Sequence, residues 1–154
     1  MGLTAWYNDA RRIEDILRPM TGRPRPGHLS LRMLEWFVRS FARRRNISVS
    51  SDGSLRNVSS LYRQWLGHYT RNLFDPFRRH ARVLVDDLCG GYVSSTCGQL
   101  NFLYWAEKFG VLAKALEHRE SIELDMPRKP PKKRGRPRGV TAPRRGFSGA
   151  GLRR

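Results

Sequence analysis

The chain has 154 residues, enough for one ordinary domain with a tail but too few for two domains with separate cores. Its 30 Lys and Arg residues outnumber its 13 Asp and Glu residues, which gives a net charge of +17. Such a chain repels itself unless a polyanion neutralises it, so nucleic acid is the first partner to consider. We find no apolar run of membrane-spanning length and no signal-peptide pattern, and we expect a soluble protein with no membrane association.

Two helices are predicted in the first third of the chain. The segment "NDARRIEDILRPM", residues 8–20, spaces its apolar residues for a short helix. Residues 29–45 predict an amphipathic helix that Ser30 caps. Its last turn holds Arg43, Arg44 and Arg45, which would complement the helix dipole and are equally candidates for secondary contacts with nucleic acid.

A polar loop, "NISVSSDGS", separates this helix from the clearest helical pattern in the chain, and its "ISVS" alternates like a strand. The pattern spaces its apolar residues by alternating steps of three and four, at Leu55, Val58, Tyr62, Trp65 and Tyr69. We therefore expect a helix from Leu55 onward.

The motif "FDPF" predicts the start of another helix, because Asp75 can cap and Pro76 suits a first helical position. Apolar residues then follow on one face of this predicted helix: Phe77, Ala81, Leu84, Val85 and Leu88. Arg78 and Arg79 would be exposed on it, as further secondary basic contacts. We expect this helix to end at Cys89-Gly90-Gly91.

Two helices are expected at the end of the domain. Thr96 and Gln99 have the spacing of a capping box, and the helix that they begin should end at Gly110. A last helix should cover residues 111–125. Strand alternation is limited to "ISVS" and "GYVSST", so the prediction is a mainly α fold: a single small domain of five or six helices over residues 1–126, with an aromatic-rich core.

Residues 127–154 differ sharply from the domain, because they hold 11 basic residues and no acidic ones. Pro, Gly, Lys and Arg dominate, and few apolar residues are left to bury. Such a segment cannot offset the entropy of ordering itself, so we predict a basic tail that is disordered when free.

Within the tail, "PPKKRGRPRG" resembles the AT-hook of chromatin-associated proteins, over about ten residues and not in the helical domain. The resemblance rests on Arg134-Gly135-Arg136-Pro137, with Arg138 after it and Lys132 and Lys133 before it. It implies binding in the minor groove of A·T-rich DNA.

The chemistry of these residues suits that groove. The minor groove over A·T pairs is narrow and strongly negative, and it draws in arginine side chains, whereas a G·C pair places an amino group on the groove floor. Gly135 would allow close backbone approach and Pro137 favours an extended path, so Arg134 and Arg136 would be inserted. The phosphate contacts would come from Lys132, Lys133 and Arg138.

Other interpretations of the tail remain open: a nuclear import signal, or a generic basic tail that binds RNA or any polyanion. A second "GRPR", in "TGRPRPG" at residues 21–27, lacks flanking lysines and suits a stiff linker or a second hook.

A helix-turn-helix is a further hypothesis for the domain, with Ala106 in a first helix, Gly110 at the turn, and Val111 and Leu116 in a second helix. Glu117, Glu120 and Glu123 on the second helix would repel phosphates, and two packed helices joined by a glycine is the commoner explanation.

Enzymatic chemistry is not expected. The four histidines lack metal-ligand spacing, and the cluster of His80, Arg82, Asp86 and Asp87 places its two carboxylates about 100° apart on a helix. Cys89 and Cys97 fit neither a zinc nor a redox motif. We expect no cofactor and no metal.

The sequence thus predicts a non-enzymatic nuclear protein that binds A·T-rich DNA through its tail, while its domain contacts a protein partner or a second copy. The alternative is a viral or other structural nucleoprotein whose tail packages RNA or DNA without base preference. A third hypothesis is an adaptor whose tail only directs import.

Overall fold

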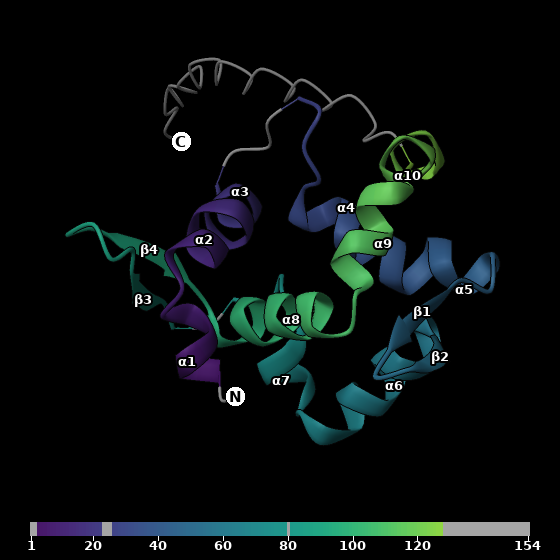
Figure 1. Ribbon diagram of the computed structural model, residues 1–154, viewed down its shortest axis with the longest axis horizontal. Helices are drawn as coiled ribbons and strands as arrows, with labels where there is room; N and C mark the ends of the chain where they lie inside the picture. Colours follow the sequence, from purple (N-terminus) through teal and green to yellow (C-terminus); the bar gives the residue numbers. More distant parts are fainter. Residues whose placement is uncertain (1–2, 23–25, 80, 128–154) are drawn as a thin grey trace, which may run out of the picture.

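The computed structural model describes residues 3–22, 26–79 and 81–127. Within these ranges helices form most of the regular structure, and four short strands pair as two antiparallel two-stranded sheets (Figure 1). The prediction of a mainly α fold with five or six helices is therefore wrong, and the fold is mixed α and β. The helical segments are α1 (Leu3–Tyr7), α2 (Ala10–Arg12), η1 (Ile13–Leu17), α3 (Arg18–Thr21), α4 (Leu31–Trp36), η2 (Phe37–Phe41), α5 (Ala42–Arg44), α6 (Val58–His68), α7 (Arg71–Phe74), α8 (Cys97–Lys108), α9 (Val111–Glu117) and α10 (Arg119–Asp125). The strands are β1 (Ser48–Ser51), β2 (Ser54–Asn57), β3 (Val83–Asp86) and β4 (Tyr92–Ser95).

Segments α2, η1 and α3 form one continuous helix, in which η1 is π-helical. Asp9 begins this helix, because its Oδ1 accepts a hydrogen bond from the Arg11 backbone N–H at 3.0 Å. Ile13 and Leu17 are fully buried, and Ile16 and Met20 nearly so. The predicted N-terminal helix is confirmed, with its apolar residues in the core.

A second continuous helix comprises α4, η2 and α5. Ser30 caps it as predicted, because its Oγ accepts a hydrogen bond from the Met33 backbone N–H at 3.2 Å. Leu34 and Phe37 have no exposed surface, and Phe41 is 1% exposed. The arginine triplet follows at its C-terminal end.

The hairpin of β1 and β2 follows this helix. Asp52 and Gly53 form its two-residue turn, with φ values of 52° and 72° that such turns require. Asn57 then begins α6 by accepting a hydrogen bond from the Ser60 backbone N–H at 3.1 Å. The strand predicted in "ISVS" is confirmed. Leu55 was predicted on the helix but lies in β2 and is 78% exposed.

The prediction of a helix from Asp75 to Leu88 is wrong. Helix α7 ends before Asp75, residues 75–79, 81 and 82 are not helical, and Val83–Asp86 form β3. Strand β3 pairs with β4, which is the strand predicted in "GYVSST", and Val85 lies opposite Val93. The pairing with β4 explains why this segment forms a strand and not a helix, since β-branched residues favour strands when a partner strand is available.

Helix α8 packs against the other helical segments through its buried residues. Thr96 begins it by accepting a hydrogen bond from the Gln99 backbone N–H at 3.2 Å, which confirms the predicted N-cap. Phe102, Leu103, Trp105 and Ala106 have no exposed surface. Figure 1 shows α1 and α7 beside α8, and α9 beyond its C-terminal end.

An aromatic cluster joins α6, α7 and α8. The Tyr62 ring lies 5.6 Å from the rings of Phe74 and Trp105, and Phe74 lies 5.8 Å from Phe102, measured between centroids. Edge-on and tilted pairs of this kind add to the energy of burial. The predicted aromatic-rich core is confirmed here, and it holds α7 and the segment after it against α8.

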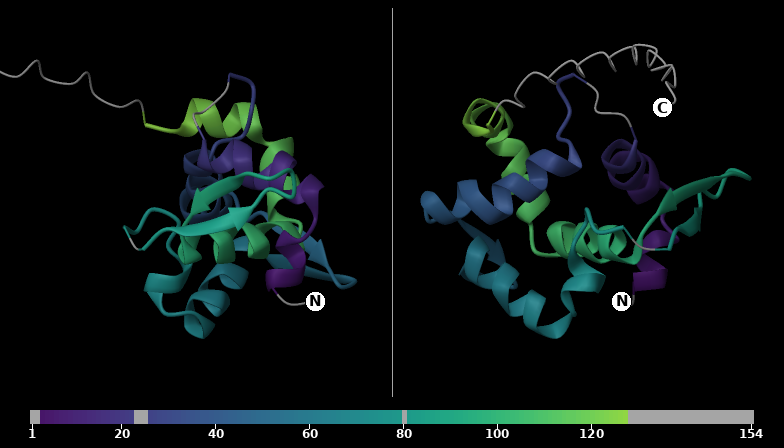
Figure 2. Two further views of the ribbon diagram at one scale, coloured as in Figure 1. Left: turned by 90° about the vertical axis from the view of Figure 1, so that its left-hand side faces the viewer. Right: turned by 180° about the vertical axis from the view of Figure 1, so that it is seen from behind.

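The β3–β4 hairpin projects from the edge of the molecule (Figure 2). Its outward residues leave apolar surface exposed: Leu84 is 65% exposed, Leu88 48% and Tyr92 66%. In the described part of the chain, no helix has the length and apolar character to cross a membrane.

Candidate nucleic-acid interface

The predicted tail site lies outside the described residues. These are the inserted residues Arg134, Gly135, Arg136 and Pro137 and the phosphate-contacting residues Lys132, Lys133 and Arg138. The same is true of Arg23, Pro24 and Arg25 in the second "GRPR". The described structure bears on the arginines of the domain, beginning with the two predicted secondary sites.

In the arginine triplet, two of the three residues bind another helix. Arg44 pairs with Asp125 of α10, and Arg45 lies 3.4 Å from the same carboxylate. The Arg45 guanidinium also lies 3.9 Å from the centre of the Phe41 ring. Arg43 is exposed and has no acidic partner among the described residues. The triplet is therefore largely a structural clamp, and only Arg43 is available to a ligand.

Asp125 is the centre of this clamp. The Trp36 indole N–H donates to its Oδ2 at 2.8 Å. This hydrogen bond, together with the positive charges of Arg44 and Arg45, holds the pKa of Asp125 below its ordinary value. The ionised carboxylate thus ties α10 to the helix formed by α4, η2 and α5.

The second predicted pair, Arg78 and Arg79, lies in a loop and not on a helix. Asp75 shapes this loop, because its Oδ1 accepts a hydrogen bond from the Phe77 backbone N–H at 2.9 Å and its carbonyl accepts one from Arg78 at 3.4 Å. Both arginines are exposed, as is Arg82. None of these three has an acidic partner among the described residues.

The loop is pressed against the first turn of α8. A Cβ atom at Gly98 would lie 2.4 Å from the backbone oxygen of Asp75, far inside van der Waals contact. The Asn101 side chain donates to the Leu73 carbonyl at 2.8 Å and holds the end of α7 to the same helix. Pro76 is buried. The loop is therefore anchored on both sides of Asp75.

Four hollows follow one another from the arginine triplet to this loop and beyond it. Their volumes are about 380, 150, 350 and 410 Å³. The first two share Arg39, Tyr62 and Leu66, the second and third share Pro76, and the third and fourth share Phe77 and Gln99. Since neighbouring hollows share lining residues, they adjoin one another in a row.

We call this row of hollows the arginine groove. It is lined by Arg32, Arg39, Arg43, Arg63, Arg78, Arg79 and Arg82. Two acidic residues also line it: Glu35 pairs with Arg39 at 2.8 Å, and Asp75 accepts the backbone hydrogen bonds of its own loop. The other six arginines have no acidic partner in the described part of the chain, so the groove carries an excess of positive charge.

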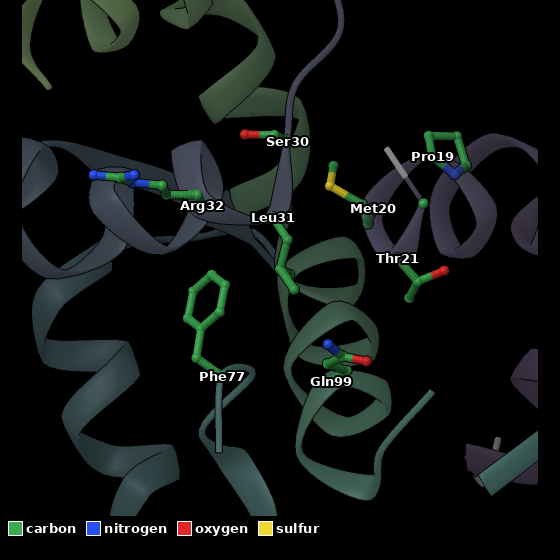
Figure 3. Close-up of a pocket in the computed structure, with 9 residues that line it drawn as sticks. Pro19, Met20, Thr21, Ser30, Leu31, Arg32, Phe77 and Gln99 are labelled. Atoms are coloured by element: carbon green, nitrogen blue, oxygen red, sulfur yellow. The ribbon is translucent and has the colours of Figure 1, made fainter. Parts of the chain in front are cut away.

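Figure 3 shows the end of the arginine groove between α3, α4 and the start of α8. The Phe77 ring rises from its loop toward Leu31 and Arg32, and Gln99 faces the same hollow. Phe77 is 51% exposed. An apolar ring thus lies beside the cationic side chains of the groove.

The acidic cluster considered for catalysis has a structural role. Asp87 Oδ1 accepts backbone hydrogen bonds from Cys89 at 3.0 Å and Gly91 at 2.7 Å, and its Oδ2 accepts one from Arg18 at 2.9 Å. The two backbone donors, with Arg18 after them, lower the pKa of Asp87. Asp86 accepts a hydrogen bond from the Leu88 backbone N–H in the same turn, and His80 lies outside the described residues.

The helix-turn-helix hypothesis finds limited support. Gly110 has φ 71° and joins α8 to α9, as predicted, and Val111 is fully buried. Leu116 lies in α9 and is 52% exposed, and α9 ends at Glu117. Across the described ranges, no group of three or more His, Cys, Asp or Glu residues is placed to hold a metal ion.

Sequence reasoning missed the arginine groove. Its residues come from α4, η2, α5, α6 and the loop after α7, and only folding brings them together. Phe77 was assigned to the buried face of a helix. Three of its arginines, Arg43, Arg78 and Arg79, were predicted as secondary basic contacts.

Comparison with known proteins places the chain among relatives without an assigned activity. The model of a family described as "Family of unknown function (DUF7197)" matches residues 4–136. A protein of Acanthamoeba polyphaga mimivirus, "Uncharacterized protein L507", is 30% identical over 107 residues, which are 64% of this chain and 41% of that protein. The chain thus spans less than half the length of this relative. No solved structure matches the chain.

Proposed function

The chain belongs to the DUF7197 family, and we propose that it is a non-enzymatic, nuclear DNA-binding protein that contacts the minor groove of A·T-rich DNA through its C-terminal residues. The observation that carries nucleic-acid binding is the arginine groove, in which six arginines lack an acidic partner within the described residues. The base preference is supported by the sequence motif at residues 130–139.

In this proposal the two basic regions have different tasks. Arg134 and Arg136 enter the minor groove and confer the preference for A·T pairs, with Gly135 and Pro137 shaping the backbone. Lys132, Lys133 and Arg138 contact phosphates, as do the exposed arginines of the groove, and these contacts add affinity without base preference.

The domain also offers a surface for a protein partner or a second copy. Leu84, Leu88 and Tyr92 expose apolar area on the projecting β3–β4 hairpin. Exposed apolar patches of this kind mark interaction sites in soluble proteins. Leu84, Leu88 and Tyr92 themselves do not line the hollows of the arginine groove.

A second candidate function is a structural nucleoprotein that packages RNA or DNA without base preference. It is favoured by the viral source of the relative that is 30% identical. A packaging protein would assemble at high concentration and bind all sequences alike. The A·T preference therefore separates the two candidates.

The test is competitive binding of the intact protein to A·T-rich and G·C-rich duplexes at physiological salt. The variant Arg134→Ala/Arg136→Ala removes the inserted pair, and Arg144→Ala/Arg145→Ala removes the same charge from the tail outside the motif. The proposal predicts an A·T preference in the wild type and in the second variant, and none in the first. Equal binding of both duplexes by the wild type would contradict it and favour packaging.

A further inference from the structure

We propose that Phe77 is a base-stacking site in the arginine groove, and that the domain binds single-stranded nucleic acid there, independently of the tail. Phe77 is 51% exposed although it is among the most apolar side chains. It is followed directly by Arg78 and Arg79, and Arg82 lines the same hollow. An aromatic face beside several cations is the arrangement with which proteins bind a single strand, by stacking a base and contacting the adjoining phosphates.

The loop holds the backbone of Phe77 in place. Asp75 accepts hydrogen bonds from the backbone N–H groups of Phe77 and Arg78, Pro76 is buried, and Gly98 allows the loop to touch the first turn of α8. A residue with an anchored backbone loses little backbone entropy when a base stacks on its side chain. The exposure of Phe77 is thus a property of an anchored loop and not of a chain end.

Polar groups for a base edge lie in the same hollow. The Gln99 carboxamide accepts a hydrogen bond from Ser95 Oγ at 3.0 Å, which fixes its orientation. Its amide N–H groups remain for an acceptor on a stacked base. Gln99 lines both hollows that meet at Phe77.

The hollows of the groove can take up the bases of a single strand, whereas a duplex would offer the groove only its phosphates. The positive charge follows a series of adjoining hollows, from Arg43 and Arg63 at one end to Arg32 at the other. A flexible strand can enter such hollows and place bases in them, whereas a stacked duplex keeps its bases inside. The proposal concerns the domain alone, so it stands or falls separately from the A·T preference of the tail.

The experiment uses the full-length chain with the tail motif disabled by Arg134→Ala/Arg136→Ala. Fluorescence anisotropy measures binding of an oligothymidylate and of an abasic strand with the same length and charge. In this background we compare Phe77→Ala, Phe77→Tyr, which keeps an aromatic face, and Leu84→Ala, which removes exposed apolar surface on β3 from a residue that does not line the groove. Circular dichroism confirms that all variants fold, which their exposed positions favour.

We expect Phe77→Ala to weaken oligothymidylate binding about tenfold and to leave abasic-strand binding unchanged. Phe77→Tyr and Leu84→Ala should bind both strands as the parent does. Equal binding of the two strands by the parent would overturn the proposal, since it would show phosphate contacts alone. An unchanged affinity in Phe77→Ala, or an equal loss of affinity for the oligothymidylate and the abasic strand, would overturn it too, the second because an effect that needs no base cannot come from stacking.

Discussion

Asp125 shows how one side chain decides the role of several arginines. It accepts hydrogen bonds from the Trp36 indole and from Arg44 and Arg45. Two residues that looked available for nucleic acid are therefore engaged in holding α10. Arg43, the residue before Arg44, is not part of this cluster and lines the arginine groove.

We predict that Asp125→Ala destabilises the domain by about 1–3 kcal/mol, because the part-buried indole N–H and two guanidinium groups lose a charged acceptor. The control is Glu120→Ala, since Glu120 is exposed and its pairing with Arg119 at 3.6 Å is a surface contact. That variant should change stability by less than about 0.5 kcal/mol. Urea unfolding at neutral pH measures the stability of both variants. An equal loss of stability in the two would contradict the structural role of Asp125.

The stabilisation by Asp125 should also depend on pH. Its pKa is lowered in the folded state, so its contribution is complete above the ordinary Asp pKa of about 4 and is lost as the pH falls through the folded-state pKa. The difference in stability between wild type and Asp125→Ala should therefore be constant above about pH 5 and shrink below about pH 4. A difference that grows on acidification would refute this assignment.

At the scale of elements, local signals in the sequence predicted most of the helices. Ser30, Thr96 and Gly110 act within one turn of their own positions, so their effects could be derived without knowledge of the fold. The π-helical turns carry no such signal. The turn at Asp52-Gly53 does carry one, because Asp-Gly favours a two-residue hairpin turn, but it was assigned to a loop and β2, which begins at Ser54, was not predicted.

The prediction of a helix over residues 75–88 was wrong for a physical reason. Its apolar spacing fits one face of a helix, but Val83 and Val85 equally fit alternate positions of a strand. The choice depends on pairing with β4 and on the contact between Asp75 and Gly98. Neither can be seen in the segment itself, and the error hid the exposure of Phe77. The arginine groove could not be predicted because it joins distant segments.

Two glycine substitutions test the anchoring of the Asp75 loop. Gly98→Ala should destabilise the domain by about 1–3 kcal/mol, because its Cβ would lie 2.4 Å from the Asp75 backbone oxygen. Gly67→Ala, in α6, meets nothing within 4 Å and should instead stabilise by up to about 1 kcal/mol through helix propensity. Thermal unfolding measures both variants. A lower stability of Gly98→Ala together with a higher stability of Gly67→Ala would support the close contact, and a stabilised Gly98→Ala variant would exclude it.

At the scale of the whole molecule, charge is unevenly distributed. In residues 1–126 the 13 acidic residues balance most of the basic ones, and several of them form structural ion pairs such as Arg18 with Asp87. In the described part of the chain, the arginine groove gathers six arginines that lack such a partner. The excess in residues 127–154 has no acidic residue within the segment to offset it. A polyanion is the natural counterpart of both regions.

The proposed phosphate contacts of the tail should appear in the salt dependence of duplex binding. For Lys132→Ala/Lys133→Ala, the slope of log K against log salt should become about 1.8 less negative, from roughly 0.9 per phosphate contact. The ratio of A·T to G·C affinity should not change, because phosphate contacts carry no base information. A titration over several salt concentrations measures both quantities. A loss of the preference for A·T over G·C duplexes would show that the lysines read bases.

The central claim is that Arg134 and Arg136 read the floor of the minor groove. The most direct measurement compares duplexes of A·T, G·C and inosine·cytosine pairs, since inosine lacks the guanine amino group while its pair keeps the other features of the G·C major-groove edge. Our account predicts that the wild type binds the inosine duplex as tightly as the A·T duplex, and that Arg134→Ala/Arg136→Ala binds all three alike. An inosine duplex bound as weakly as G·C would place the recognition outside the minor groove and contradict the account.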